Sequence, residues 1–276
     1  MLQVLNIAGY KFITLSELPA LRAELLDKCL KLGLKGTILL SEEGINLNLA
    51  GLPQNVGAFI VDFQHDTRFA DMTFRKSYSS EQPFRLMLVK VKKEIITMRQ
   101  ADVQPDSTQR APSLSPAELK QWLDEGRDIT LLDTRNHYEV KFGTFAGATH
   151  LNIEDFSEFP SAAAGVVNEK PVVMFCTGGI RCEKAALHLL NAGFSNVYQL
   201  DGGILNYFSK MGGAHYDGEC FVFDQRIAVD PNLKATGTVQ CHICQGPVTR
   251  EMQTSLQDLT AMACLSCKNQ SLNLTE

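Results

Sequence analysis

The sequence contains no apolar run that approaches the roughly 18 residues needed to cross a bilayer as a helix. Its opening residues, MLQVLNIAGYKF, lack the basic segment, apolar run and cleavage site of a signal peptide. No G-x-G-x-x-G motif follows a predicted strand, and no flavin, NAD or haem motif is found. We therefore expect a cytoplasmic protein with no membrane partner. Its eight cysteines then stay reduced and need a reason other than structural disulfides.

The charge of the chain is unevenly distributed. The net charge over 276 residues is −5, which excludes a generally basic nucleic-acid binder. However, residues 1–100 carry 13 basic against 10 acidic side chains, and the remainder carries 13 against 21. Such asymmetry is typical either of an RNA-facing surface or of an ordinary solvated strand face, and charge alone leaves both open. The tentative RNA-binding residues are Arg68, Arg75, Lys76, Arg85, Lys90, Lys92 and Lys93.

The first hundred residues predict a ferredoxin-like sandwich of order βαββαβ, in which two helices cover one sheet. Leucines at helical spacing and alternating strand patterns carry this prediction. The expected elements are a strand over 4–13, a helix over 15–34, a hairpin over 36–51, a helix over 52–66 and a strand over 84–98.

The pattern changes to alternating strands and helices after a polar segment with two prolines, read as a linker over 101–113. Ser115, Pro116 and Glu118 together form a strong helix start. The near-continuous apolar strand VVMF favours a buried parallel sheet, so this domain is predicted to be α/β. The predicted regions are a ferredoxin-like domain over 1–100, an α/β domain over 114–212 and a cysteine-rich region over 213–276.

Cys176 follows the VVMF strand directly and precedes a predicted helix. This position lies at the carboxyl edge of a parallel sheet, where such folds place their sites, and beside free N–H groups of a helix start. Gly178 and Gly179 let the loop curl around the sulfur, and Arg181 adds a positive charge. Each feature favours the thiolate, so Cys176 is the predicted reactive thiol rather than an inert buried cysteine.

The loop Cys176-Thr177-Gly178-Gly179-Ile180-Arg181 resembles the six-residue active-site loop of rhodaneses. Upstream, Asp133, Arg135, Glu139, Gly143 and Gly147-Ala148 are similar to the family's Asp-x-Arg, Glu, Gly and Gly-Ala pattern. Thr144 departs from it, because many rhodaneses have histidine there. The resemblance implies a rhodanese domain with Cys176, Arg181, Asp133 and Arg135 as catalytic residues. The six-residue loop also favours sulfur chemistry over that of related phosphatases, whose loop is longer.

The resemblance extends over nearly the whole chain. The hairpin GTILLSEEGINLNLAG, the stretch CTGGIRCEKA and the later FVFDQRIAV resemble the bacterial tRNA uridine hydroxylases. This implies oxygen-dependent 5-hydroxylation of the wobble uridine, with the tRNA anticodon loop as partner, molecular oxygen as co-substrate and Cys176 acting directly or as a persulfide. His137 and Glu139 superficially resemble two ligands of an iron site. We instead attribute Glu139 to the rhodanese pattern and His137 to surface exposure.

The loop by itself is compatible with two other functions. One is a sulfurtransferase that passes sulfane sulfur through a Cys176 persulfide. The other is a thiol redox sensor or binding module, in which Cys182 acts as a resolving thiol. Cys182 could equally be a small packed residue in the first turn of the helix.

Two C-x-x-C pairs, separated by 19 residues, stand near the end of the chain. Each short pair turns two sulfurs toward one ion, and two pairs complete a tetrahedral zinc shell. The segment is poor in large apolar residues, so a metal would help it to fold. The sequence therefore predicts a structural zinc site, with loss of the metal or two disulfides as alternatives. Its ligands are Cys241, Cys244, Cys264 and Cys267.

Overall fold

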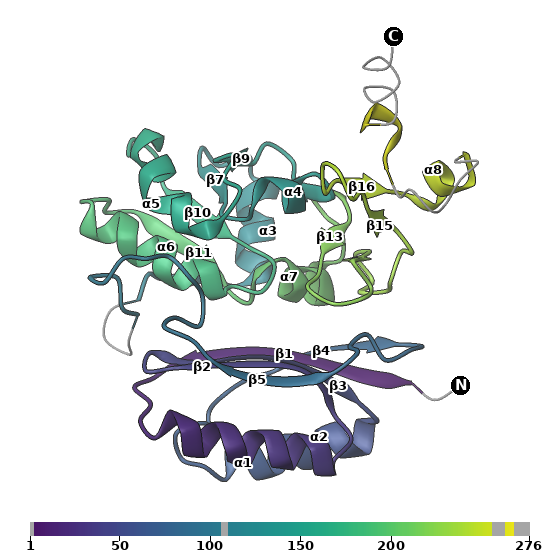
Figure 1. Cartoon of the computed structure of the whole chain (residues 1–276). Coiled ribbons are helices and arrows are strands. Elements are labelled where there is room, and N and C mark those ends of the chain that lie inside the picture. The colour runs from purple at the N-terminus through teal and green to yellow at the C-terminus, as the bar shows by residue number, and fades with distance from the viewer. Residues whose placement is uncertain (1–2, 106–109, 256–262, 268–276) are drawn as a thin grey trace.

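The computed structural model describes residues 3–105, 110–255 and 263–267. The N-terminal domain is a five-stranded sheet with two helices on one face (Figure 1). Its strands follow the spatial order β4-β1-β3-β2-β5. The elements are β1 (Val4–Phe12), α1 (Leu18–Lys31), β2 (Lys35–Ser41), β3 (Gly44–Gly51), α2 (Pro53–Gln64), β4 (Arg75–Ser79) and β5 (Met87–Val91).

The first four strands form the predicted ferredoxin-like sheet, but the strand that completes it is not the expected one. β1 pairs antiparallel with both β3 and β4, and β2 pairs antiparallel with β3. The completing strand is β4, whose sequence RKSYS contains no aliphatic residue and was not predicted. The expected strand over 84–98 is instead a fifth strand, β5, parallel to β2, and it ends at Val91. Alternation in the sequence indicated a strand there without indicating its partner.

The two faces of the N-terminal sheet differ in polarity. One face packs against α1 and α2 through a core that includes Leu5, Ile7, Leu47 and Phe59. The opposite face carries Asn6, Ala8 and Tyr10 of β1, and opposite them Ala50, Asn48 and Asn46 of β3. Because side chains alternate along a strand, these residues share a face, and that face is turned toward the central domain (Figure 1). The second domain therefore rests on a polar sheet surface.

The central domain contains a five-stranded sheet, all of whose pairs are parallel, in the order β6-β11-β10-β7-β9. Helix α3 begins at the Ser115 N-cap, and Ser115 and Glu118 form the predicted reciprocal cap. The elements are β6 (Ser113–Leu114), α3 (Pro116–Asp124), β7 (Thr130–Asp133), α4 (His137–Val140), β8 (Gly143–Phe145), β9 (Thr149–His150), η1 (Phe156–Glu158), α5 (Phe159–Ala162), η2 (Ala163–Gly165), β10 (Val172–Phe175), α6 (Ile180–Asn191), β11 (Val197–Leu200) and α7 (Gly203–Met211).

Both faces of this sheet are buried, as the apolar run VVMF predicts. Val172 and Met174 of β10 pack with α5 and α6 in one core. Val173 and Phe175 point the other way, into a second core with α3 and α7. The α/β fold class is thus confirmed, and β10 delivers Cys176 to the carboxyl edge of a sheet that is rigidly packed on both sides.

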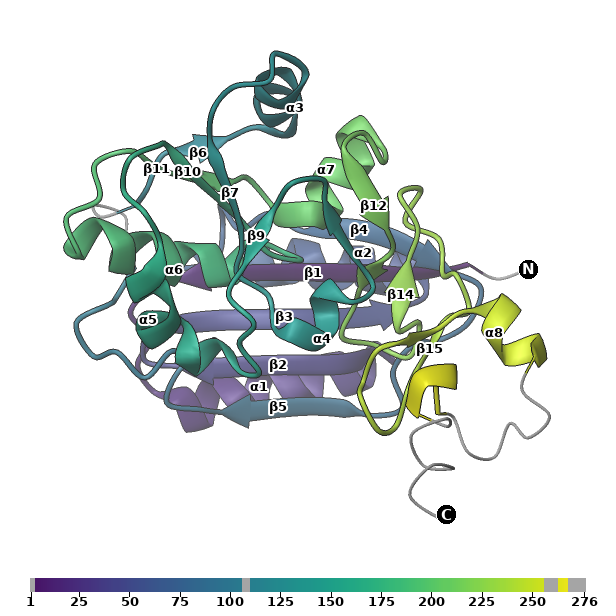
Figure 2. The same ribbon diagram turned by 90° about the horizontal axis from the view of Figure 1, so that it is seen from above.

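The segment after β5 does more than connect two domains. Met98, Val103 and Ala111 are buried in the core of the central domain, although their surroundings in sequence are polar. Residues 106–109 of the expected linker lie outside the described residues. Because this segment packs into the central domain, the two domains are held close together, and the central domain lies across the N-terminal sheet in the view from above (Figure 2).

Beyond α7 the chain forms short strand pairs and a small cysteine-bearing unit. β12 pairs with β8 of the central domain, and the other two pairs are β13 with β14 and β15 with β16. Residues 256–262 and 268–276 of the predicted cysteine-rich region lie outside the described residues. In the described part of the chain, no helix is long and apolar enough to cross a membrane. The elements are β12 (Tyr216–Gly218), β13 (Cys220–Phe221), β14 (Ala228–Val229), β15 (Val239–Gln240), β16 (Pro247–Val248) and α8 (Arg250–Ser255).

Candidate active site

Cys176 lies between the end of β10 and the first turn of α6, and its side chain is fully buried. The N–H of Gly179 donates to Cys176 Sγ at 3.0 Å, a geometry that needs the positive φ of 96° at Gly179. Burial alone would raise the pKa of this thiol. The side chain of Cys182, the charge of Arg181 and the N–H groups of Arg181 and Gly179 outweigh burial, so the pKa of Cys176 is lowered. The loop therefore favours a thiolate at neutral pH.

A second loop closes over the backbone of the first. The N–H groups of Ile204 and Leu205, at the start of α7, donate to the carbonyls of Cys176 and Thr177 at 2.9 and 3.1 Å. Gly203 makes this contact possible, because a Cβ at that position would lie 2.3 Å from the Cys176 carbonyl oxygen. Gly203 also has a φ of 65°, so two separate constraints select glycine there. This supporting role of Gly203 was not predicted from the sequence.

Arg181 does not present a free charge to the cleft. Its guanidinium forms a buried ion pair with Glu139 of α4, with Nη2 lying 2.8 Å from Oε1. Thr177 Oγ1 donates to the same carboxylate oxygen at 3.3 Å. Arg181 thus lowers the pKa of Cys176 from a fixed position, while Glu139 anchors the loop to α4. The sulfur of Cys176 and the carboxylate of Glu139 both interact with the guanidinium of Arg181. The six-residue loop therefore carries little net positive charge.

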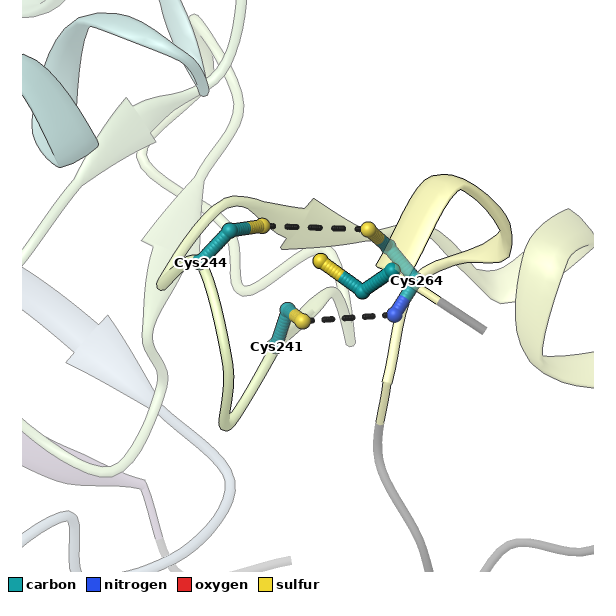
Figure 3. Close-up of side chains that lie close together, drawn as sticks. Cys241, Cys244 and Cys264 are labelled. Atoms are coloured by element: carbon teal, nitrogen blue, oxygen red, sulfur yellow. Dashed lines mark hydrogen bonds between the residues drawn. The ribbon is translucent and has the colours of Figure 1, made fainter. Parts of the chain in front are cut away.

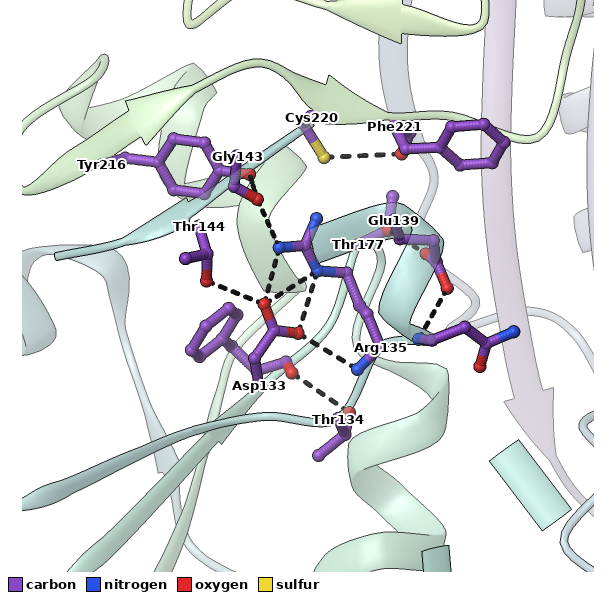
Figure 4. A network of polar contacts seen from close by, with 12 residues as sticks. Asp133, Thr134, Arg135, Glu139, Gly143, Thr144, Thr177, Tyr216, Cys220 and Phe221 are labelled. Carbon is purple, nitrogen blue, oxygen red and sulfur yellow. Dashed lines mark hydrogen bonds and ion pairs between the residues drawn. The ribbon is translucent and has the colours of Figure 1, made fainter. Parts of the chain in front are cut away.

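Asp133 and Arg135 do not line the cleft, and they form a buried polar network with Gly143 and Thr144 (Figure 4). Both side chains are fully buried, and Arg135 Nε donates to Asp133 Oδ1 at 2.9 Å. Thr144 Oγ1 donates to Asp133 Oδ2 at 2.8 Å, so the threonine that departs from the rhodanese pattern satisfies this carboxylate. Between them, Thr134 Oγ1 donates to the carbonyl of Phe175 at 3.1 Å. Because neither Asp133 nor Arg135 lines the cleft, we infer that both support the loop, and their expected catalytic role stays a prediction.

Cys182 lies in the first turn of α6, fully buried, with Sγ 3.7 Å from Thr134 Oγ1. Burial and the neighbouring Cys176 raise the pKa of Cys182 well above its usual range. None of the eight cysteines, all of which lie in the described part of the chain, forms a disulfide. A resolving role for Cys182 stays a prediction. Cys29, with a fully buried side chain in α1, belongs to the N-terminal core.

A cleft of about 960 Å³ separates the polar face of the N-terminal sheet from the loop of Cys176. Cys176, Thr177, Gly178, Ile180 and Arg181 line one wall. The other walls come from β1, β3 and β4 of the N-terminal domain, and from the segment after β13. These other walls contain several residues that the sequence alone did not indicate, among them Tyr10, Asn46, Asn48, Phe223 and Arg226.

Two buried acid–base clusters hold the cleft walls together. Lys184 of α6, only 1% exposed, bonds Glu43 of the N-terminal hairpin at 2.8 Å and Glu94 at 2.7 Å. Next to it, Glu183 accepts from the hydroxyl of Tyr10 at 3.1 Å and from Arg110 Nε at 3.0 Å. Because both clusters start from the helix that carries the active-site loop, they fix that loop against the N-terminal sheet.

The seven tentative RNA-binding residues do not form one surface. Arg75, Lys76 and Lys92 line the cleft, whereas the other four do not. Of those four, Arg68 is engaged by Asp66, with Nε lying 3.0 Å from Oδ1. Sequence proximity grouped these cations, but strand pairing places them on different parts of the sheet.

His137 and Glu139 do not form an iron site. Glu139 is engaged by Arg181, and His137 stacks on His150 with ring centroids 6.1 Å apart. His137 is half-buried, so the expectation of surface exposure was wrong. Within residues 3–105, 110–255 and 263–267, the one group of three or more potential metal ligands is the four-cysteine cluster.

The four cysteines of the two C-x-x-C pairs converge on one point (Figure 3). All four sulfurs lie within 4.8 Å of one another, and the Sγ atoms of Cys244 and Cys264 are 3.7 Å apart. Tetrahedral zinc with bonds of about 2.3 Å requires sulfurs roughly 3.8 Å apart, so the spacing suits that ion. The N–H of Cys264 donates to Cys241 Sγ at 3.3 Å, as backbone groups do in thiolate sites. Lys141 Nζ donates to the Cys244 carbonyl at 3.2 Å and ties the cluster to the central domain.

Comparison with known proteins agrees with this architecture. Residues 4–95 match the UPF0176 acylphosphatase-like domain, and residues 115–210 match the rhodanese-like domain. A tRNA uridine(34) hydroxylase of Cupriavidus metallidurans is 48% identical over 274 residues, which cover 96% of this chain and 97% of the relative. The chain belongs to the tRNA uridine(34) hydroxylase family. A relative of the same name from Paraburkholderia xenovorans is 46% identical, with 96% of each chain covered.

Within this family the rhodanese domain is one part of a longer protein. A solved rhodanese-like domain from Anabaena is 25% identical and covers 39% of this chain and 79% of its own, with a TM-score of 0.34. The hydroxylase relatives from Cupriavidus metallidurans and Paraburkholderia xenovorans each cover 96% of this chain. The resemblance to the tRNA uridine hydroxylases, which was expected from CTGGIRCEKA, GTILLSEEGINLNLAG and FVFDQRIAV, is confirmed.

Proposed function

We propose that this protein hydroxylates uridine 34 of tRNA, with Cys176 as the catalytic residue. The observation that carries the proposal is the position of the Cys176 loop. The Cys176 loop and the polar face of the N-terminal sheet enclose a cleft of about 960 Å³. This volume is in the size range of ligand sites and can admit a single base. A pocket closed by two domains suits a base taken out of its stack.

The chemistry expected of Cys176 is nucleophilic. A thiolate, directly or as a persulfide, can add to C6 of the electron-poor uracil ring and make C5 electron-rich. Molecular oxygen is the proposed co-substrate: one oxygen atom becomes the 5-hydroxyl, and the other leaves as water with two electrons from a thiol reductant that is oxidised to its disulfide. Loss of the C5 proton then expels the thiolate and restores the ring. The lowered pKa of Cys176 keeps the sulfur ionised, and the Gly179 N–H holds it toward the cleft. Arg181 and the loop residues Thr177 to Ile180 orient the sulfur.

The test is nucleoside mass spectrometry of total tRNA. A strain lacking the gene should contain no 5-hydroxyuridine, and supplying this chain from a plasmid should restore it. Growth of the complemented strain with little oxygen should lower the level, because oxygen is a proposed co-substrate. Unchanged 5-hydroxyuridine in the deletion strain would contradict the proposal.

The partner in this proposal is the anticodon loop of tRNA, so the cytoplasm is the expected compartment. Arg75 and Lys92 are the cations proposed to face RNA, because they line the cleft that contains the catalytic thiol. Lys76 also borders the cleft, but it pairs with Ile7 of the helix-side core, so its side chain points to the opposite face of the sheet. Arg68, Arg85, Lys90 and Lys93 lie outside the cleft lining and are not needed for this contact.

We also propose that the four C-terminal cysteines bind one structural zinc ion. The supporting observations are that all four candidate ligand atoms are sulfurs and that they lie within 4.8 Å of one another. The ion would hold together a short segment whose own apolar cluster is small, and would keep it attached at Lys141.

Elemental analysis of freshly purified protein should find one zinc per chain. Replacing Cys264 and Cys267 together by serine should reduce zinc to below about a tenth per chain, since two ligands cannot hold a closed site. The matched control is Cys220 to serine, which removes a buried thiol elsewhere and should leave the zinc content unchanged. Much less than one zinc in the wild-type protein argues against the site.

A further inference from the structure

Arg75, the first residue of β4, projects from the N-terminal sheet toward the catalytic loop. It pairs in register with Ala8, so its side chain lies on the polar face that lines the cleft. Its guanidinium lies over the ring of Tyr10, with the central carbon 5.7 Å from the ring centroid. This contact fixes the plane of the guanidinium.

Two glycines of the central domain lie against this side chain, and of these Gly202 makes room for it, whereas the distance at Gly179 is an ordinary van der Waals contact. A Cβ at Gly202 would lie 2.9 Å from Arg75 Nε, and one at Gly179 would lie 3.6 Å from Arg75 Nη2. Gly179 is the residue whose N–H binds the sulfur of Cys176. Arg75 therefore reaches from one domain to the loops that carry and support the thiolate of the other.

Arg75 differs from the neighbouring arginines in its lack of a carboxylate partner. Arg181 is bonded to Glu139, and Arg226 Nη2 lies 2.6 Å from Asp224 Oδ2. Among the described residues, no carboxylate lies within 4.0 Å of the Arg75 guanidinium, and its shielded Nε has no hydrogen-bond partner. A guanidinium N–H that is shielded from water without a partner is unfavourable, and an anionic ligand that accepts from Nε would remove that penalty.

We infer that Arg75 binds a phosphate of the RNA strand, namely a phosphodiester that flanks the nucleotide whose base reaches Cys176. The inference rests on the proposed function and adds the group that recognises the backbone at the site of reaction. The planar fork of arginine donates two parallel hydrogen bonds to phosphate oxygens, which fixes the register of the strand as well as its affinity. A base carbonyl could also accept from this guanidinium, but it carries no charge to offset that of Arg75.

The two ligands differ in how binding depends on salt. Each phosphate contact to a single strand contributes about 0.7 to the slope of log affinity against log salt, because a counterion is released. A contact to a base carbonyl contributes nothing to that slope. The slope therefore separates a phosphate site from a base-reading site, whatever the loss in affinity.

The experiment uses the full-length protein and an anticodon stem-loop RNA with uridine at position 34, titrated by fluorescence anisotropy at several NaCl concentrations. Arg75→Gln should bind about tenfold more weakly at low salt, with a slope shallower by about 0.7. Arg75→Lys keeps the charge without the fork and should keep the slope while losing affinity. The control Arg85→Gln removes an exposed arginine outside the cleft lining and should change neither quantity.

Weaker binding by Arg75→Gln with an unchanged slope would show that the guanidinium reads a base and would overturn the inference. An equal change in Arg85→Gln would overturn it too, because net charge alone would then explain the effect. Thermal unfolding of each variant checks that the fold is intact, and Arg75→Lys supplies a second variant if the glutamine variant unfolds. Deletion-strain tRNA that keeps its 5-hydroxyuridine refutes the proposed function instead, while the slope still reports on Arg75.

Discussion

Replacing Cys176 by serine should abolish 5-hydroxyuridine in tRNA while leaving the protein folded. Serine is nearly isosteric, but its hydroxyl stays protonated at neutral pH, whereas the loop lowers the pKa of the Cys176 thiol. The Gly179 N–H and the charge of Arg181 then act on a neutral oxygen that cannot serve as nucleophile. We expect the rate of uridine hydroxylation to fall by roughly 10³-fold or more, which is the order of magnitude seen when a catalytic nucleophile is removed.

The measurement is nucleoside mass spectrometry of tRNA from a deletion strain that expresses the variant. Cys29→Ala is the matched control, because it removes a fully buried thiol from α1 of the N-terminal core, away from the cleft. It should restore 5-hydroxyuridine to the wild-type level. If tRNA from the Cys176→Ser strain is still hydroxylated, the thiol is not the catalytic group.

Replacing Asp133 by asparagine should destabilise the central domain strongly. The carboxylate and Arg135 are both 0% exposed, and Asp133 also accepts from Thr144 (Figure 4). Asparagine keeps the shape but leaves Arg135 as an uncompensated buried charge, a change that typically costs about 3–5 kcal/mol. Urea unfolding followed by the fluorescence of Trp122 measures this loss. Trp122 is the one tryptophan of the chain and packs edge-on against Tyr198 in the central domain, with ring centroids 5.3 Å apart.

Two further variants separate this effect from a general loss of charge. Glu125→Gln breaks the exposed pair with Arg127 and should leave the urea midpoint of unfolding nearly unchanged, because solvent screens this pair. The double variant Asp133→Leu, Arg135→Met removes both buried charges and should recover much of the lost stability. A change below about 1 kcal/mol in Asp133→Asn would mean that this pair does not stabilise the domain.

Local signals in the sequence were sufficient for the parts of the site that are continuous in the chain. The strand VVMF, two glycines and Arg181 predict the thiolate loop, because strand end, turn and helix start lie within a few residues. The C-x-x-C spacing predicts a cluster for the same reason, since two neighbouring sulfurs already face one point. The Ser115 cap is local as well, and it is present as predicted.

The features of the fold and of the site that the sequence did not predict depend on contacts between segments that are distant in the chain. β4 has no aliphatic residue, and it becomes a strand because the free edge of β1 offers hydrogen bonds to it. Asp133 and Arg135 carry the same charges in either a catalytic or a supporting role, and only their position relative to the cleft distinguishes the two.

The sequence by itself therefore determined the loop that carries Cys176, the kind of domain that holds it and the cluster of four cysteines, because each depends on neighbouring residues and on α/β patterning. Only the tertiary structure decided what faces Cys176. Strand pairing selects which cations of the N-terminal sheet reach the cleft, and Lys184 and Glu183 fix the distance between its walls. Those interactions join residues far apart in the chain, and local spacing carries no information about them.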